Sequence, residues 1–205
     1  MSKKGIIAVI SGFSGAGKGT VVNELIRKYG YVVSVSATTR SPRQGEIDGQ
    51  NYFFKTQEEF REMIEKDQLI EYAQYVDNYY GTPKEYVFEQ LNNGKDVLLE
   101  IEMQGALKIK EKMPEVSLIF ITPPSMEELK NRLVKRGTET EEVIGKRLAR
   151  AKEECSYMSS YDFIVENDDL EECVETLHAL LQSLHFSRLN QREQIAAIKE
   201  DFDKY

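Results

Sequence analysis

The chain has 205 residues, of which 40% are hydrophobic and 10% aromatic, and this is enough to bury the core of one compact domain. Its formal net charge of −8 argues against a general binder of nucleic acid or of anionic membranes, which would normally carry a basic surplus. The apolar run near the N-terminus is too short for a signal peptide, and no run approaches the roughly 20 residues of a membrane-spanning helix. Cys155 and Cys173 lack metal-ligand spacing, so we expect reduced thiols and a cytoplasmic location.

Short apolar runs alternate with longer amphipathic segments, which predicts an α/β fold with a mainly parallel sheet. The expected strands cover residues 5–10, 31–36, 96–102, 117–122 and 162–166. Helices are expected where a hydroxyl residue is followed three positions later by glutamate, as at Thr56, Thr82, Ser125 and Thr138. Pro83 and Gly94 are expected just inside the start and just past the end of one of these helices.

Two segments interrupt this alternation. Residues 39–80 are rich in aromatic residues and partly alternating, which predicts small antiparallel strands in an inserted module. After Pro123 and Pro124 a second insertion of two charged helices is expected, and residues 187–205 should form an exposed helical tail. His178 and His185, in a C-terminal helical pattern, are interpreted as surface or packing residues.

The segment GFSGAGKG, residues 12–19, matches the phosphate-binding pattern G-x-x-x-x-G-K. It follows an apolar strand and opens a helical pattern, which is the context that this motif requires. Glycines let successive backbone amides turn toward one anion, and Lys18 adds a charge for the outer phosphates of a nucleoside triphosphate. The predicted triphosphate site consists of Gly12, Phe13, Ser14, Gly15, Ala16, Gly17, Lys18, Gly19 and Thr20.

Gly19 stands where many phosphate loops have a hydroxyl residue that binds Mg²⁺ directly, and Thr20 comes one position later. No N-K-x-D base-reading motif accompanies the loop. Both features weaken the interpretation as a GTP-driven switch and favour a kinase that acts on a small molecule.

A second anion site is predicted in SATTRSPRQGE, residues 36–46, where Arg40 and Arg43 flank Pro42. Two arginine forks can hold one phosphate together, and Tyr52 and Tyr80 can add phenolic hydrogen bonds. The alternative is that these are solvated surface arginines beside packed tyrosines.

Taken with QLIEYAQYVDNYYGTP, LLEIEMQGA, RLVKRGTETEEVIGKRL and DFIVENDD, these motifs resemble, in order and nearly to residue 169, the guanylate kinase family. The resemblance implies a phosphate-loop nucleoside monophosphate kinase fold and the reaction of ATP with GMP (or dGMP) to ADP and GDP, with Mg²⁺. It implies a core of residues 1–36, 94–124 and 158–186, a GMP-binding module of residues 37–93, a helical lid of residues 125–157 and a tail of residues 187–205.

The resemblance also implies individual roles. The GMP site would consist of Ser36, Arg40, Arg43, Tyr52, Glu71, Tyr80, Gly81, Thr82, Glu100 and Glu102. Arg132, Arg136, Asn167 and Asp168 would join the ATP site, and the catalytic residues would be Lys18, Arg40, Arg136 and Arg147. Mg²⁺ would be held by phosphates and water, with Thr20 and Glu100 in its outer shell. No role is assigned to Arg150.

Glu71 suits guanine chemically, because the ring imino and exocyclic amino hydrogens of guanine lie side by side and one carboxylate can accept both. Adenine presents an acceptor at the first position, so a buried carboxylate would reject it. Glu100 and Glu102 end an expected strand and should share a face. Two positions depart from the family: Glu102 replaces the usual aspartate, and Phe13 stands where relatives often carry proline.

Two further alternatives stay open from the sequence. A kinase for another nucleoside monophosphate would keep the loop and the lid but not Ser36 and Glu71. A non-catalytic protein-binding module of the same fold would typically lose the loop that is intact here. The sequence leaves the oligomeric state undetermined.

Overall fold

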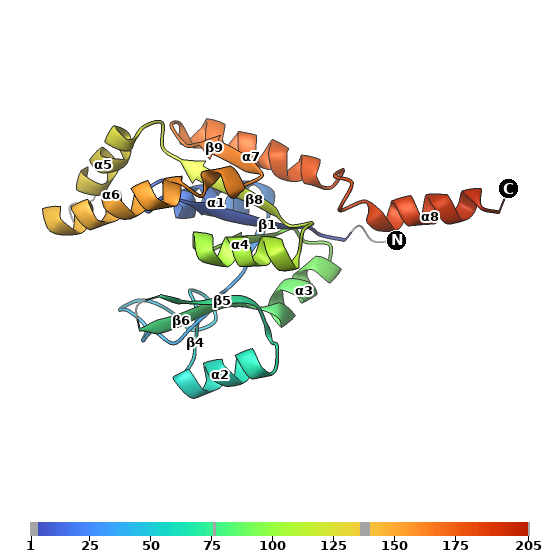
Figure 1. The fold of residues 1–205 in the computed structure, drawn as a ribbon, viewed down its shortest axis with the longest axis horizontal. Helices are drawn as coiled ribbons and strands as arrows, with labels where there is room; N and C mark the ends of the chain where they lie inside the picture. The colour runs from blue at the N-terminus through green and yellow to red at the C-terminus, as the bar shows by residue number, and fades with distance from the viewer. Residues whose placement is uncertain (1–3, 76, 136–139, 205) are drawn as a thin grey trace.

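The structure is a computed structural model that describes residues 4–75, 77–135 and 140–204. It is an α/β fold in which the described strands form two separate sheets, one above the other in Figure 1. Within the described residues, every helix is too short or too polar to span a lipid bilayer.

The larger sheet is parallel throughout, with the strand order β2-β7-β1-β8-β9. Its strands are β1 (Ile7–Gly12), β2 (Val32–Val33), β7 (Val97–Glu100), β8 (Ser117–Thr122) and β9 (Phe163–Glu166). In register, Ile10 of β1 stands opposite Glu100 of β7 and Ile119 of β8. The carboxyl ends of neighbouring strands therefore meet at one edge, which is where open α/β sheets bind ligands.

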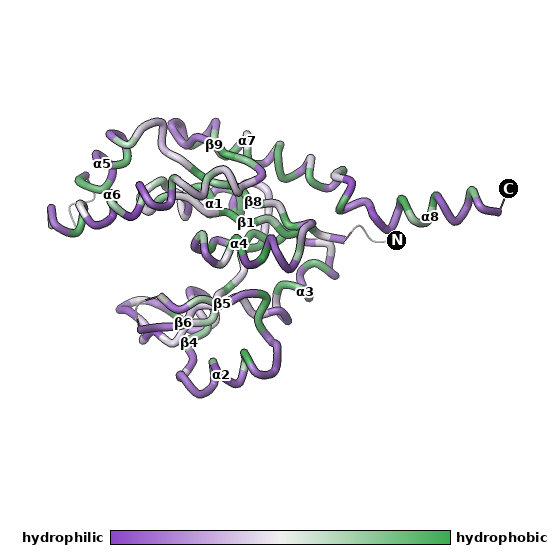
Figure 2. Tube along the Cα trace, viewed as in Figure 1, coloured by the Kyte–Doolittle hydropathy of each residue, from purple (hydrophilic) through white to green (hydrophobic). Residues whose placement is uncertain are grey.

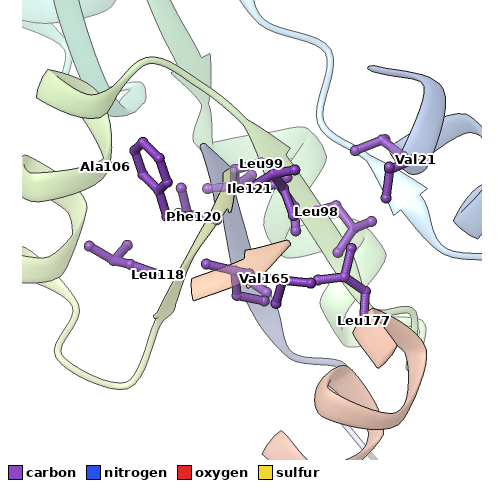
Figure 3. Packing of buried hydrophobic residues seen from close by; sticks show 14 of the residues in the cluster. Val21, Leu98, Leu99, Ala106, Leu118, Phe120, Ile121, Val165 and Leu177 are labelled. Carbon is purple, nitrogen blue, oxygen red and sulfur yellow. The ribbon is translucent and has the colours of Figure 1, made fainter. Parts of the chain in front are cut away.

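Helices cover this sheet on both faces (Figure 1). Helix α1 (Lys18–Tyr29) packs against α7 (Leu170–Leu184), and α3 (Lys84–Asn92) packs against β7. Helix α4 (Met103–Lys112) contacts β1 and β8 and also reaches the smaller sheet. The apolar core lies between these layers, as Figure 3 shows for Val21, Leu98, Leu99, Ala106, Leu118, Phe120, Ile121, Val165 and Leu177.

The smaller sheet has the order β4-β3-β6-β5. It consists of β3 (Ala37–Thr38), β4 (Phe53–Phe54), β5 (Leu69–Tyr75) and β6 (Asn78–Pro83). Helix α2 (Gln57–Glu65) begins at the predicted capping box, in which Thr56 and Glu59 satisfy each other's backbone amides. Phe60 of α2, Ala37 and Leu69 form a small core of their own.

Two charged helices follow β8, as expected. Ser125 accepts a hydrogen bond from the Glu128 amide at the start of α5 (Met126–Lys135), and Thr140 caps α6 (Glu141–Cys155). A single 3₁₀ turn, Met158–Ser160, leads into β9. The tail contains α8 (Arg192–Phe202), which has no buried residue and extends away from the rest of the chain (Figure 1), with alternating hydrophilic and hydrophobic positions (Figure 2).

Several predictions about local structure are corrected. The expected strand 31–36 is split, because β2 ends at Val33 and the chain crosses to the other sheet, where the Ser36 carbonyl accepts from Phe53. The pair β3–β4 is parallel, although β3–β6 and β5–β6 are antiparallel as expected. The predicted cap residue Thr138 lies outside the described residues.

The third helix begins differently from the prediction. Pro83 is the N-cap of α3, and the Thr82 hydroxyl bonds to the Glu71 side chain instead of capping the helix. Thr82 still belongs to β6, where its hydroxyl donates to the buried Glu71 carboxyl, and the helix begins only after Pro83. Gly94 follows the C-cap with a φ of 73°, as predicted for a helix end.

The two histidines and the buried Cys173 have packing roles, whereas Cys155 is exposed. The ring of His178 stacks on Tyr29 with centroids 3.6 Å apart, and buried His185 lies 2.9 Å from the Asp96 carboxylate. Cys155 and Cys173 are both free thiols.

Candidate functional site

The segment between β1 and α1 is a loop in which three glycines adopt positive φ values. Gly12, Gly15 and Gly17 have φ values of 149°, 101° and 91°, which favour glycine. A β-carbon at Gly12 would lie 2.1 Å from the Ile121 carbonyl oxygen, so β8 also excludes a side chain there. Gly17 caps α1 with its backbone alone, which leaves the first amides of the helix for an anion.

Lys18 is folded back over this loop. Its Nζ donates hydrogen bonds to the carbonyl oxygens of Gly12 and Phe13, at 2.7 and 3.1 Å. The ammonium group is thereby held against the backbone of the loop. Burial raises the pKa of the nearby Glu100 carboxyl, and the positive charge of Lys18 opposes this rise.

The end of β9 and helix α5 approach the loop from the other side. Buried Asn167 donates from Nδ2 to the Ala16 carbonyl at 2.7 Å, and Arg132 donates from Nη1 to the Asn167 carbonyl at 2.9 Å. Asp168, by contrast, is exposed and lines a hollow between β9 and α7. Three of the residues predicted for the ATP site, Ala16, Arg132 and Asn167, therefore meet at the loop, and Asp168 lies in the neighbouring hollow.

Helix α6 contributes Arg147, whose Nη1 donates to the Ser14 hydroxyl at 2.9 Å. This contact joins residues 133 positions apart and places a guanidinium directly on the loop. Arg136, predicted to act beside it, lies outside the described residues.

The second anion site is centred on Arg40. Its guanidinium bonds both carboxylate oxygens of Glu46, at 3.0 and 2.8 Å, and lies 5.3 Å from the ring centroid of Tyr52. Tyr52 in turn makes an edge contact with Tyr80, with centroids 6.1 Å apart. The structure therefore brings together three of the residues that the sequence singled out.

Glu46 is a residue of this site that the sequence reasoning missed. It also accepts a hydrogen bond from the backbone amide of Arg43 at 2.6 Å, whereas the Arg43 side chain is exposed. The Arg40 hydrogen bonds, followed by that from the Arg43 amide, hold the pKa of Glu46 below its ordinary value. Arg40 and Glu46 lie in the connection between β3 and β4, outside any helix or strand, so no periodic pattern indicated the pair.

Glu71 of β5 is the most deeply buried acidic side chain of the site, with 4% of its surface exposed. Its Oε1 accepts from the Thr82 hydroxyl at 2.9 Å. Burial raises the pKa of Glu71, while the Thr82 hydrogen bond and the charges of Lys108 and Lys112 oppose that shift. Gly81, next to Thr82, lies where a β-carbon would come within 2.8 Å of the Glu71 carbonyl oxygen.

Ser36 lies at the crossing between the two sheets. Its carbonyl accepts from Phe53, and its side chain is half-buried. Its position thus links the two sheets at the predicted GMP site.

Glu100 and Glu102 do not share a strand face, and this prediction is wrong. Strand β7 ends at Glu100, and Glu102 is already the N-cap of α4, so the expected alternation stops between them. Glu100 stays beside the loop, where a β-carbon at Gly19 would lie 3.7 Å from its Oε1. Desolvation by the surrounding protein raises the pKa of Glu100 although its side chain is exposed, and Lys18 opposes this shift.

Glu102 instead binds Arg150 of helix α6, with 2.8 Å between Nη2 and Oε2. Arg150 also bonds buried Glu154 from Nε at 2.9 Å. Arg150, to which the sequence assigned no role, therefore connects α6 to the start of α4. The i,i+4 spacing of Arg150 and Glu154 could have indicated the second bond, but the contact with Glu102 is visible only in the fold.

The donors near the loop suit a hydrated Mg²⁺ ion. No group of three or more His, Cys, Asp or Glu side chains placed to hold a metal occurs in the described ranges. Glu100 and the exposed hydroxyl residue Thr20 supply oxygen donors beside the loop, and Mg²⁺ commonly binds through phosphates, waters and one or two carboxylates. The residues present therefore fit this ion in an outer-shell arrangement.

Comparisons with known proteins agree on one family. A family model described as guanylate kinase matches residues 4–184. A guanylate kinase of Caldanaerobacter subterraneus subsp. tengcongensis is 57% identical over 182 residues, 88% of each chain. That of Halalkalibacterium halodurans is 55% identical and covers 91% of this chain and 92% of its own. That of Oceanobacillus iheyensis is 49% identical over 98% of both chains.

A solved structure is similar as well. The crystal structure of guanylate kinase from Anaplasma phagocytophilum matches with a TM-score of 0.74 and 35% identity, covering 91% of this chain and 89% of that one.

Proposed function

The chain belongs to the guanylate kinase family and acts as a guanylate kinase, and we propose that it transfers the terminal phosphoryl group of ATP to GMP, or to dGMP, with Mg²⁺ as cofactor. The observation that carries the choice of acceptor is the buried carboxyl of Glu71, which is oriented by Thr82 in the same small sheet that holds Tyr80. A guanine base can donate two adjacent hydrogens to such a group, whereas adenine cannot.

ATP is assigned to the loop between β1 and α1. Its phosphates would take the place of internal partners around Gly12–Thr20, with Lys18, Arg132, Arg136 and Arg147 supplying positive charge. Asn167 and Asp168 are proposed to line the base pocket. The contact of Arg147 with Ser14 supports this assignment, because it brings a lid guanidinium to the loop.

GMP is assigned to the small sheet. Arg40, Arg43, Tyr52 and Tyr80 would hold its phosphate, and Ser36, Glu71, Gly81 and Thr82 would surround its base. Glu100 and Glu102 are proposed to lie beside the nucleoside at the carboxyl edge of the large sheet. Mg²⁺ would neutralise charge on the phosphates, with Glu100 and Thr20 orienting its water ligands.

The proposed catalysis consists of positioning and electrostatic stabilisation. The GMP phosphate is already anionic and needs no strong base, so the protein must hold two nucleotides in line and exclude water. Lys18, Arg40, Arg136 and Arg147 are proposed as the catalytic residues that compensate the charge on the transferring group.

We assign residues 1–36, 94–124 and 158–186 to the core, 37–93 to a GMP-binding module, 125–157 to a lid and 187–205 to a tail. The separate small core of Ala37, Phe60 and Leu69 supports a module that can move as a unit. Two free thiols suit a cytoplasmic location.

A coupled assay of ADP release, with ATP and Mg²⁺ and with GMP, dGMP, AMP, CMP and UMP offered separately, tests the proposal. We expect turnover with GMP and dGMP alone. Equal turnover with AMP would overturn the guanine assignment. The absence of ADP release with every acceptor would favour a non-catalytic binding module.

A further inference from the structure

Gly105 is a buried glycine in the first turn of α4, the helix that contacts both sheets. Its φ is not positive, so any residue could adopt its backbone conformation. Alanine in a helix interior is favoured over glycine by about 1 kcal/mol. The reason for glycine at this position must therefore lie in the space around it.

That space is taken by the side chain of Glu71. A β-carbon at Gly105 would lie 2.7 Å from Oε2 of Glu71 and 3.1 Å from its Cδ. The next neighbour, Cδ1 of Ile101, would be at 3.4 Å, which is ordinary contact. The carboxyl of Glu71 is thus bracketed, with Thr82 bonded to Oε1 and the bare backbone of Gly105 against the side of Oε2.

We propose that Gly105 is a positioning residue for guanine selectivity, because its missing side chain lets the Glu71 carboxyl lie against the first turn of α4 with both oxygens in a fixed orientation. The inference rests on the proposed function of Glu71 as the guanine reader. The first turn of a helix carries partial positive charge, which favours a carboxylate at this place. Binding sites of this kind tolerate displacements of only ~0.5 Å.

Alanine at position 105 should move the carboxyl and leave the fold intact. The atoms that the new methyl group meets belong to the far end of a side chain, which can turn away at small cost. At Gly81, in contrast, the added carbon would meet a backbone oxygen at 2.8 Å, so that substitution would disturb β5 itself. Gly105→Ala should therefore change the orientation of the Glu71 carboxyl without disturbing the backbone of the sheet.

The test compares GMP with IMP, which lacks the exocyclic amino group and so loses one of the two hydrogen bonds to the carboxylate. In Gly105→Ala we expect kcat/KM for GMP to fall by about 10–100-fold, with a much smaller change for IMP and an unchanged KM for ATP. The GMP/IMP ratio should therefore fall by about tenfold or more. A merely structural role would lower both rates together and leave the ratio unchanged.

Gly145→Ala is the matched control. Gly145 lies in helix α6 with an ordinary φ, and a β-carbon there would have no neighbour within 4 Å. This variant should keep the wild-type ratio.

Glu71→Gln separates the role of Glu71 in guanine binding from the role of Gly105 in positioning it. If Glu71→Gln keeps the wild-type GMP/IMP ratio, the guanine assignment itself fails. If the GMP/IMP ratio falls in Glu71→Gln but stays at the wild-type value in Gly105→Ala, only the role of Gly105 is overturned. In the double variant, the two losses should not add, because both act through one carboxyl.

Should Gly105→Ala fail to fold, Glu71→Asp in the same chain withdraws the carboxyl by one methylene and gives the methyl group room. Recovery of a cooperative thermal transition would support the contact, and its absence would contradict it.

Discussion

The two guanidinium nitrogens Nη1 and Nη2 of Arg40 bind the two carboxylate oxygens of Glu46, so the arginine proposed to hold the GMP phosphate is already fixed by an anion of the protein. Glu46 also accepts a hydrogen bond from the backbone amide of Arg43, and it therefore orders the turn that carries both arginines. An arginine held in this way loses less conformational freedom when a phosphate arrives.

Glu46→Gln should raise the KM for GMP by about tenfold, since one charge-assisted pair that orients Arg40 is lost. The KM for ATP should stay unchanged. Glu62→Gln is the control, because Glu62 makes a similar pair with Lys66 on the exposed surface of α2. A lower KM in Glu46→Gln, measured by steady-state kinetics, would mean that Glu46 competes with the phosphate.

Lys18→Ala should reduce kcat by at least ~10³-fold, because the charge next to the outer phosphates is removed from the transition state. GMP binding, measured by calorimetry, should persist, because the small sheet is untouched. Lys66→Ala, at the exposed C-cap of α2, should leave both quantities unchanged. Loss of GMP binding together with turnover would contradict separate sites for the two nucleotides.

Glu71→Gln should raise the KM for GMP by about 100-fold or more and the KM for ATP far less. The same change should stabilise the ligand-free protein at neutral pH by ~1 kcal/mol, because burial raises the pKa of Glu71 and deprotonation therefore costs folding free energy.

The sign of this effect can be followed by thermal unfolding between pH 4 and 8. Below the ordinary glutamate pKa the carboxyl is protonated in the folded and unfolded states, so wild type and variant should be equally stable. As the pH rises through the raised pKa, wild type alone should lose stability. A constant difference across the range would exclude Glu71 as its source.

Arg150→Met should destabilise the protein by ~1 kcal/mol, since buried Glu154 loses its cation, with the effect reduced by the partial exposure of Arg150. The loss should shrink at acid pH, where Glu154, whose pKa is raised by burial, becomes neutral. We expect kcat to fall as well, because Arg147 lies one turn away on α6.

Lys146→Met is the control on the same helix, because Lys146 pairs with Glu142 in full solvent. Adding Glu154→Gln to Arg150→Met should restore most of the lost stability. If it does not, the buried carboxylate is not the cause.

Removal of residues 193–205 should leave kcat/KM within about twofold of wild type. Helix α8 contains no buried residue, and the family model ends at residue 184. The cut spares the hydrogen bonds from Asn190 and Gln191 to the end of α7. A large loss of activity would reveal a role for α8 that its exposure does not indicate.

The sequence predicted those parts of the fold that depend on local chemistry. Glycines at fixed spacing, a preceding apolar run and Lys18 were sufficient for the path of the phosphate loop, and Thr56 with Glu59 was sufficient for the start of α2. The family resemblance, confirmed by the comparisons, supplied the fold and the activity.

The errors occurred where distant residues compete for the same group. Thr82 has the pattern of a helix cap, but it lies in β6, where its hydroxyl donates to the buried Glu71 carboxyl. Glu102 alternates correctly for a strand, yet the strand stops two residues earlier and Arg150 pairs with it from α6. Glu46 and Gly105 were missed because their importance depends on side chains that only the folded chain brings close.

The buried carboxyl of Glu71 has a calorimetric consequence. Because burial raises the pKa of Glu71 in the free protein and a guanine edge would favour the carboxylate, binding of GMP at mildly acid pH should release a proton into the medium. The heat of GMP binding should then depend on the ionisation enthalpy of the buffer, and GMP affinity should weaken as the solution is acidified. ATP, which would meet no such group, should bind with the same heat in every buffer once its own protons are accounted for.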